Sequence, residues 1–243
     1  MIYLDHNSTS KVKHSVQEAM LLFFSDERFG NASSIHQIGK KSKSAIADAR
    51  EVLAQQFTAD SGEEFCFTSG GTEATNMAIK GAFFRAQADA KRFHLFINPV
   101  EHEATLQSAD FVESLGARVT RLSVNSHGQI DLDELQGYLR LFAADKSNVL
   151  MVSQMAANNE TGILFPYAEI GALAKEYGAF YHLDATQLPG KVERFSINDS
   201  QADLVTLSAH KIGGPKGVGC LYVKKGTKLV SLMHGGAQER KRR

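Results

Sequence analysis

The chain has 243 residues, of which 43% are hydrophobic, and this length is enough for one large domain with a substantial core. Its 27 Lys and Arg residues balance its 27 Asp and Glu residues, so no charge pattern for binding nucleic acid or an anionic membrane is present. Two cysteines are too few for a disulfide framework or a metal cluster. The first residues lack a signal-peptide pattern, and no apolar run is long enough to span a bilayer. We therefore expect a soluble cytoplasmic protein with no metal site.

Short apolar runs alternate with helix-period segments along the chain. Strands are expected at 63–69, 93–99, 118–124, 148–154, 179–185, 202–208 and 218–224. Helices are expected at about 13–24 and 42–57, and then at 73–88, 102–116, 132–142 and 168–178. This alternation predicts an α/β fold, a three-layer α/β/α domain with a mostly parallel, mixed sheet of about seven strands. Because the link between the last two strands is too short for a parallel crossover, we expect that pair to be antiparallel.

The first predicted strand ends in a candidate phosphate site, at the edge where ligands bind in sheets of this kind. It runs through Ser69-Gly70-Gly71-Thr72 straight into a helix. The two glycines allow a tight turn, and the N–H groups of the helix start can cradle a phosphate together with the hydroxyl groups. The spacing matches neither the dinucleotide fingerprint nor the P-loop, so a dinucleotide or ATP is disfavoured. A plain glycine turn with a hydroxyl cap is the alternative interpretation.

Two further strand ends carry polar side chains. His102 stands at a helix start, where it could stack on a ligand ring or transfer protons. Taken alone, it is more simply a solvated or capping histidine. The fourth strand runs into Asn158-Asn159-Glu160, whose amides suit recognition of a ring hydroxyl or a substrate carboxylate. Asn-rich loops are, however, usually only turns.

Asp184 closes the fifth predicted strand and is the most informative acid of the chain. A buried carboxylate needs a cationic or hydrogen-bonding partner. A protonated pyridine nitrogen would serve, and the carboxylate would keep that ring an electron sink. Gln187, three residues further on, can reach a ring oxygen. A helix cap or an ion pair is the alternative interpretation of Asp184.

Lys211 closes the sixth predicted strand, in the run Ser208-Ala209-His210-Lys211. Beside small residues a lysine can be desolvated, which lowers its pKa from about 10.4 and makes it able to form an imine. Ser208 and His210 alternate with it and could contact a phosphate. Lys216 is the competing lysine, but it follows a proline in a turn that should be exposed. Pyridoxal 5′-phosphate is the ligand that uses Lys211, Asp184 and the phosphate cradle together.

Eight motifs in this order resemble those of the cysteine desulfurases, which belong to the class V aminotransferase group of fold-type I pyridoxal-phosphate enzymes. The motifs are Tyr3-Leu4-Asp5-His6-Asn7, Gly30-Asn31-Ala32-Ser33-Ser34-Ile35-His36, the segment 68–76, Glu101-His102, Asn158-Asn159-Glu160-Thr161-Gly162, Asp184-Ala185-Thr186-Gln187, Ser208-Ala209-His210-Lys211 and Gly235-Gly236-Ala237-Gln238-Glu239.

The resemblance implies a role for each matching residue. Lys211 would carry the cofactor as a Schiff base, Asp184 would pair with the pyridine nitrogen, and His102 would stack on the ring and move protons. Gln187 would contact the ring oxygen, and Asn159 would lie near that oxygen and the substrate carboxylate. The residues expected to hold the phosphate are Gly71, Thr72, Ser208 and His210.

The resemblance also implies an activity and partners. The substrate would be L-cysteine, which is converted to L-alanine while its sulfur passes to an enzyme cysteine as a persulfide. A homodimer is expected, together with a sulfur-acceptor protein such as one of iron–sulfur cluster assembly. A selenocysteine lyase or another class V aminotransferase is an open alternative. So is a subunit that binds the cofactor without turnover.

The catalytic cysteine of that family has no counterpart in this chain. It lies on a loop far beyond the Schiff-base lysine, whereas only 32 residues follow Lys211 here. Cys66 and Cys220 each fall inside a predicted strand and are interpreted as core residues. We expect an N-terminal segment over 1–14 and a cofactor-binding large domain over 15–243, with the small C-terminal domain absent and apolar surface exposed on the early helices. The final run to Arg243 departs from the family pattern, so Arg243 receives no role.

Overall fold

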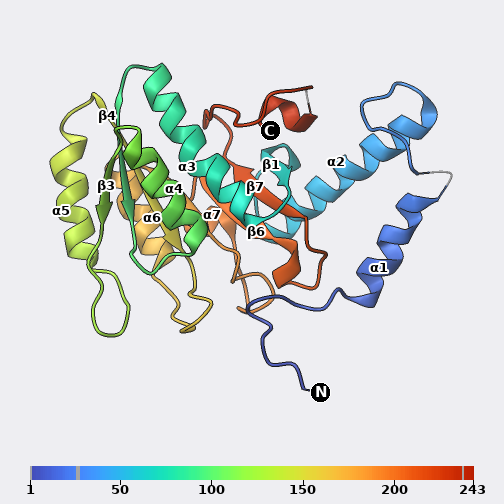
Figure 1. Cartoon of the computed structure of the whole chain (residues 1–243), viewed down its shortest axis with the longest axis horizontal. Coiled ribbons are helices and arrows are strands. Elements are labelled where there is room, and N and C mark those ends of the chain that lie inside the picture. The colour runs from blue at the N-terminus through green and yellow to red at the C-terminus, as the bar shows by residue number, and fades with distance from the viewer. Residues whose placement is uncertain (1, 26–27, 237) are drawn as a thin grey trace.

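The computed structural model describes residues 2–25, 28–236 and 238–243 (Figure 1). In this part of the chain, seven strands form one sheet in the order β1-β7-β6-β5-β4-β2-β3. The strands are β1 Phe65–Thr68, β2 Arg92–Ile97, β3 Arg118–Arg121, β4 Asn148–Met155, β5 Phe180–Asp184, β6 Leu204–Ser208 and β7 Gly219–Val223. The helices are α1 His14–Leu21, α2 Gln37–Phe57, α3 Gly71–Ala88, α4 Glu103–Ser114, α5 Leu132–Ala143, α6 Tyr167–Glu176 and α7 Ile197–Ser200.

The strand directions agree with the sequence analysis. Strands β2 to β6 pair in parallel, while β7 is antiparallel to β6 and also to β1. The predicted α/β fold and the antiparallel final pair are therefore confirmed.

Some elements differ from those predicted. Helix α2 begins at Gln37 rather than at 42, because the His36 ring accepts a hydrogen bond from the Gly39 N–H group at 3.2 Å and caps the helix. Strand β3 stops at Arg121 rather than at 124, and Val124 instead pairs with Ile130 in an isolated bridge. The short helix α7 was not predicted.

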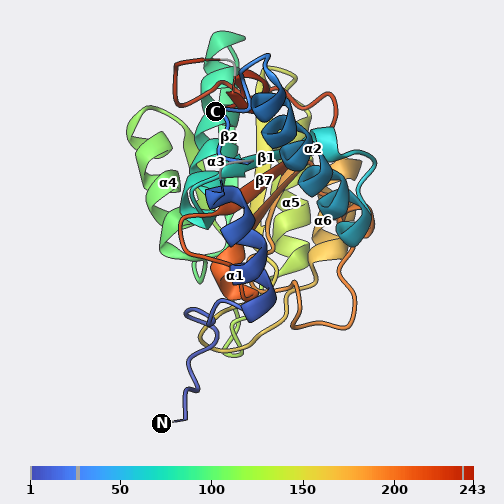
Figure 2. The same ribbon diagram turned by 90° about the vertical axis from the view of Figure 1, so that its right-hand side faces the viewer.

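Helices cover both faces of the sheet, as Figures 1 and 2 show from two sides. Alternate strand residues point to opposite faces, so Leu95 and Ile97 pack against the α3 and α4 side while Phe96 packs on the other side. Helices α2, α5 and α6 contribute the remaining core on that second face. The result is the three-layer arrangement that the sequence predicts.

Four strands end together at one edge of the sheet. In the parallel register, Met155 of β4 pairs with Asp184 of β5, which pairs with Thr206 of β6. Strand β1 reaches the same edge because Thr68 and Ser208 both pair with Gly219. A Cβ atom on Gly219 would lie 2.5 Å from the backbone of Gly70, so the turn after β1 can pass there only because this residue is glycine.

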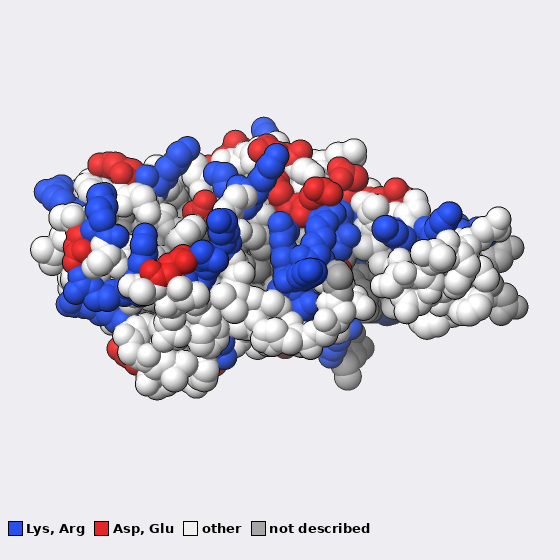
Figure 3. All heavy atoms as spheres, turned by 90° about the horizontal axis from the view of Figure 1, so that it is seen from above, with Lys and Arg blue, Asp and Glu red and all other residues white. Residues whose placement is uncertain are grey.

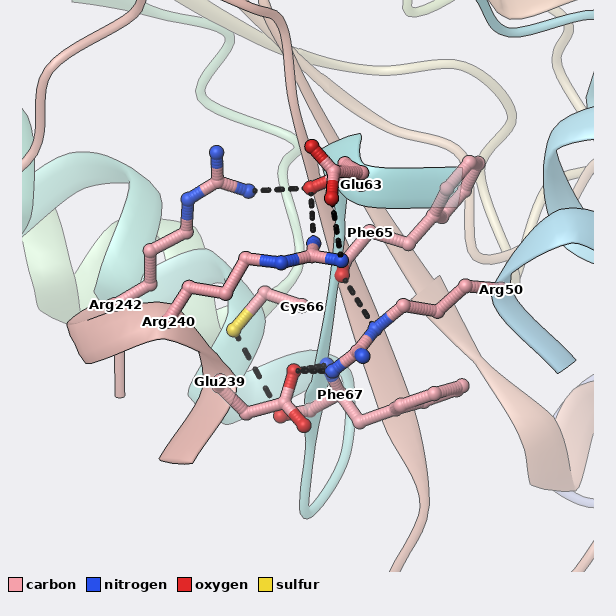
Figure 4. Close-up of polar contacts among 8 residues, drawn as sticks. All are labelled: Arg50, Glu63, Phe65, Cys66, Phe67, Glu239, Arg240 and Arg242. Carbon is pink, nitrogen blue, oxygen red and sulfur yellow. Dashed lines mark hydrogen bonds and ion pairs between the residues drawn. The ribbon is translucent and has the colours of Figure 1, made fainter. Parts of the chain in front are cut away.

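Side chains cover the outer edge of β1 (Figure 4). Arg50 of α2 donates from Nε to the Phe65 carbonyl oxygen at 3.2 Å. Glu239 accepts from the Phe67 N–H group at 2.9 Å and pairs with Arg50 at 2.7 Å. These contacts satisfy groups that an open edge strand would otherwise present to another chain.

Helix α1 projects from the end of the molecule opposite α5 and has no buried residue (Figure 1). At its C-terminal end Leu21 is 66% exposed, and Phe24 in the turn that follows is 77% exposed. In Figure 3 the right-hand end of the molecule shows a few Lys or Arg side chains and otherwise uncharged residues on the face that is seen. The expected apolar exposure of the early helices is therefore present. In the described part of the chain, every helix is too short or too polar to cross a membrane.

Candidate cofactor site

A cavity of about 280 Å³ opens at the edge where these strands end. Its lining contains every residue that the sequence analysis selected, namely Gly71, Thr72, His102, Asn159, Asp184, Gln187, Ser208, His210 and Lys211. Six lining residues were not selected, namely Ser8, Thr75, Ala104, Met155, Ala157 and Thr186. A cavity of about 260 Å³ lies near the other ends of the strands and contains none of the selected residues. The nine selected residues thus converge on the first cavity.

Lys211 reaches the cavity from a short 3₁₀ turn, 209–211, that directly follows β6. Its Nζ atom donates hydrogen bonds to the carbonyl oxygens of Asn7 at 2.7 Å and Ser8 at 2.9 Å. Burial lowers the pKa of the Lys211 amine, while the carboxylates of Asp184 and Asp5 act in the opposite direction. The shift brings the amine closer to the neutral form that attacks a carbonyl group.

Asp184 lies at the end of β5 with only 8% of its surface exposed. Its Oδ1 atom accepts the Thr186 N–H group at 2.9 Å. The side chain lines the cavity together with Lys211, so a carboxylate and an amine face the same space. A buried carboxylate in this place can pair with a cationic ring nitrogen.

A fully buried histidine lies next to Asp184 on the same face of β5. The ring nitrogens of His182 lie 2.8 Å from the Ser153 hydroxyl and 2.9 Å from the Thr206 hydroxyl. The Thr206 hydroxyl in turn lies 3.3 Å from that of Thr75, which lines the cavity. Burial lowers the pKa of His182 to about 4, and the Asp184 charge opposes this shift. The ring is therefore neutral and supports the floor of the site.

Glu101 is a second buried acid near Asp184. Its Oε1 atom accepts the Met155 N–H group at 2.7 Å, which ties the segment before α4 to the end of β4. Burial raises the pKa of Glu101 well above its ordinary value; the Met155 bond acts in the opposite direction, and the Asp184 charge adds to the rise. The Glu101 carboxyl group thus fixes the chain next to His102.

His102 is the N-cap of α4, where its Nδ1 atom accepts the Ala104 N–H group at 3.0 Å. Because Nδ1 accepts, the neutral ring carries its proton on Nε2. The same imidazole lines the cavity. The capping and ligand-facing interpretations of this histidine are therefore compatible.

The start of α3 forms the predicted cradle. A Cβ atom on Gly71 would contact Thr186, Ser208 and Thr206 at 3.4, 3.5 and 3.6 Å, so it would fill this corner of the cavity. The first N–H groups of a helix lack intrahelical partners and favour an anion. The hydroxyl groups of Thr72 and Ser208 and the ring of His210 also line this corner. Burial, followed by the charges of Lys211 and Lys216, lowers the pKa of His210. This donor set fits a phosphate group.

Both cysteines of the chain are core residues, as expected. Cys66 is 1% and Cys220 is 5% exposed. Burial raises the pKa of Cys66 to about 12 and also raises that of Cys220. Neither thiol is a nucleophile at neutral pH.

Lys216, the competing lysine, is exposed, as expected for a turn residue. Among the described residues, no three or more metal-binding side chains form a cluster.

Comparison with known families then decides the assignment. The chain matches the family model "Aminotransferase class-V" over residues 2–242. The chain belongs to this family. Proteins of this family and fold depend on pyridoxal 5′-phosphate, so the expected cofactor is confirmed at the level of the family.

Relatives and solved structures give more detail about class V aminotransferases similar to this one. The chain is 43% identical over 242 residues to the cysteine desulfurase IscS of Dictyoglomus turgidum and 44% identical over 243 residues to a cysteine desulfurase of a Nostoc species. These matches cover the whole of this chain but 59% and 58% of the two relatives. A NifS-like protein has a TM-score of 0.90 at 35% identity, covering 99% of this chain and 64% of the other.

A second solved structure, described as SspA in complex with cysteine, has a TM-score of 0.89 at 34% identity. The match covers 99% of this chain and 67% of that one. The resemblance in sequence motifs and the fold are thus confirmed. This chain spans less than three fifths of the length of the curated relatives described above.

Proposed function

We propose that this chain binds pyridoxal 5′-phosphate and acts on L-cysteine as a cysteine desulfurase, yielding L-alanine. The observation that carries this proposal is the convergence of all nine selected residues on one cavity at the strand ends. The relatives named cysteine desulfurase support the same reaction class. When bound, the cofactor supplies an electron sink for negative charge at the substrate Cα atom.

Each residue of the cavity has a proposed role that follows from its chemistry. Lys211 would hold the cofactor covalently and could act as a base, while Asp184 would face the ring nitrogen. His102 would stack on the ring and move protons through Nε2. Gln187 and Asn159 would donate to the ring oxygen, and Asn159 would also lie near the substrate carboxylate. The phosphate is held by the cradle residues Gly71, Thr72, Ser208 and His210.

The sulfur of the substrate needs a thiolate acceptor other than the two cysteines of this chain, since both are buried with raised pKa values. An acceptor thiol attacks the substrate sulfur, the carbon–sulfur bond breaks, and the acceptor keeps the sulfur as a persulfide. The carbon skeleton takes up a proton and leaves as alanine. We propose that a sulfur-acceptor protein, such as one of iron–sulfur cluster assembly, then takes the sulfur onward in the cell.

The test is to incubate the cofactor-loaded chain with L-cysteine, with and without dithiothreitol as the acceptor thiol. We expect alanine and sulfide to form with dithiothreitol, and Lys211→Ala to abolish both. Alanine formed only from cysteine plus a 2-oxo acid would indicate an aminotransferase instead. Preference for L-selenocysteine would indicate a selenocysteine lyase. Cofactor binding without either product would contradict the desulfurase proposal and favour a subunit that binds the cofactor without turnover.

A homodimer in the cytoplasm is proposed as well. The exposed apolar side chains of Leu21 and Phe24 support a contact surface for a second chain at the α1 end of the molecule. Light scattering on the purified chain gives the mass directly. A monomer at all accessible concentrations would contradict the dimer.

A further inference from the structure

Lys191 is a second lysine next to the cavity, and it contacts Asn7, as Lys211 does. The Nζ atom of Lys191 donates to the side-chain oxygen of Asn7 at 2.9 Å, and Lys211 donates to the backbone oxygen of the same residue at 2.7 Å. Burial, followed by the charge of Lys211, lowers the pKa of Lys191. Two ammonium groups thus converge on one residue at the mouth of the cavity.

A turn encoded in the sequence brings Lys191 to this place. In the run Leu188-Pro189-Gly190-Lys191, the Lys191 N–H group donates to the Leu188 carbonyl oxygen at 3.0 Å. Gly190 has a φ of +72°. Proline in the second position and glycine with positive φ in the third are typical of a type II turn. The turn returns the lysine side chain to Gln187, four residues earlier.

The contact between Lys191 and Gln187 settles which way the Gln187 carboxamide faces. The Lys191 ammonium group donates to Oε1 of Gln187, and Nε2 of Gln187 donates to the Asn7 carbonyl oxygen at 3.0 Å. An ammonium group can only donate, so only the oxygen of the carboxamide can face it. The amide N–H groups must therefore face away from Lys191. The Gln187 side chain lines the cavity and is 9% exposed, so little of it is open to hydrogen bonds with water.

We propose that Lys191 is a positioning residue of the cofactor site, which holds the Gln187 carboxamide so that its N–H group is available to the ring oxygen of the cofactor. This inference rests on the proposed function. Lys191 is not among the residues that line the cavity, and its effect passes through Gln187. Without Lys191 only the Asn7 carbonyl oxygen holds the carboxamide in this orientation, so the carboxamide reverses more readily and places its oxygen where a donor is needed. A reversed carboxamide would repel an anionic ring oxygen.

The readout is the bound cofactor itself, through its pH-dependent absorbance and its dissociation constant. A donor to the ring oxygen favours the deprotonated chromophore, so losing that donor raises the midpoint of the absorbance change. For Lys191→Met we expect a rise of about 0.5 to 1 pH unit and binding weaker by about fivefold, the effect of one hydrogen bond. Lys191→Arg keeps a donor for Oε1 and should restore most of both values. Lys146→Met, on an exposed turn, is the matched control.

A double-mutant cycle tests whether the effect passes through Gln187. In the Gln187→Met background, Lys191→Met should produce less than half of the change that it produces in the wild-type background. Equal changes in both backgrounds, or a Lys191→Met variant that titrates like the wild type, would overturn the inference and leave the proposed function intact. If the wild type and Lys146→Met take up no cofactor, the proposed function fails, and this inference fails with it. Circular dichroism of each variant separates these outcomes from unfolding.

Discussion

The Nζ atom of Lys211 lies 2.7 Å from the carbonyl oxygen of Asn7, although the two residues are 204 positions apart in the chain. The N-terminal segment therefore borders the cavity and occupies the amine that is to bond the cofactor. Carbonyl oxygens accept from the charged amine, which must lose a proton and turn away before it attacks an aldehyde. Attachment of the cofactor should accordingly depend on the charge of Lys211 and on the groups that set it.

The pH dependence of cofactor attachment is the first prediction. Only the neutral amine attacks, so the rate rises with pH up to the pKa of Lys211, which burial lowers from 10.5. The Asp184 carboxylate favours the charged amine. Asp184→Asn should therefore shift the rate profile to lower pH, as measured by stopped-flow absorbance. Asp133→Asn, on an exposed part of α5, is the control, and a shift of the Asp184→Asn profile to higher pH would refute the link.

Glu101 gives the second prediction. Burial favours the neutral form of its carboxyl group. Glu101→Gln keeps the acceptor for the Met155 N–H group, so it should leave stability at neutral pH unchanged or increased. Glu101→Ala leaves that N–H group unpaired and opens a cavity, at a cost of about 2 to 4 kcal/mol. Urea unfolding measures both. A Gln variant that is as unstable as the Ala variant would show that the acid is needed in its charged form.

The same acid makes stability depend on pH. The folded-state pKa of Glu101 lies above its unfolded value of 4.5, so its contribution is complete below 4.5 and is lost as pH rises toward the folded-state pKa. The stability advantage of Glu101→Gln over the wild type should therefore grow as pH rises above 4.5. An advantage that shrinks over this range would contradict the raised pKa.

The third prediction concerns His182, whose contribution to stability changes with pH in the direction opposite to that of Glu101. Its pKa is about 4 in the folded state against 6.5 for an ordinary histidine, so the unfolded chain gains a proton between these values that the folded chain does not. Its contribution is complete above 6.5 and falls as pH drops toward 4, by up to about 1.4 kcal/mol per pH unit. In His182→Gln this slope should be smaller by one proton. His127→Gln, an exposed histidine, should keep the wild-type slope, and equal slopes in both variants would exclude His182 as its source.

Much of the site could be predicted from the sequence because parallel strands place their carboxyl ends at one edge. Asp184, Lys211 and Gly71 each follow a recognisable apolar run, and this alone brings them together. The eight motifs then gave the residues between them a role by resemblance.

The remaining parts of the site depend on contacts that no local pattern encodes. His182 is one of several polar residues inside strands, and only the register with Ser153 and Thr206 shows that both of its ring nitrogens are bonded. Lys191 follows a turn that the sequence does encode, but its partner Asn7 comes from the other end of the chain. The sequence motif containing Asn7 was visible, whereas its position over Lys211 was not.

The most direct test of the cofactor site is to find which lysine carries the cofactor. The chain is loaded with pyridoxal 5′-phosphate, and the bond between the lysine and the cofactor is reduced with borohydride. The labelled peptide is then identified by mass spectrometry after digestion. We expect one label, on Lys211, and its loss in Lys211→Ala, while Lys191→Arg keeps it. A label on Lys191 or Lys216 in its place, or no label at all, would contradict the assignment of this cavity as the cofactor site.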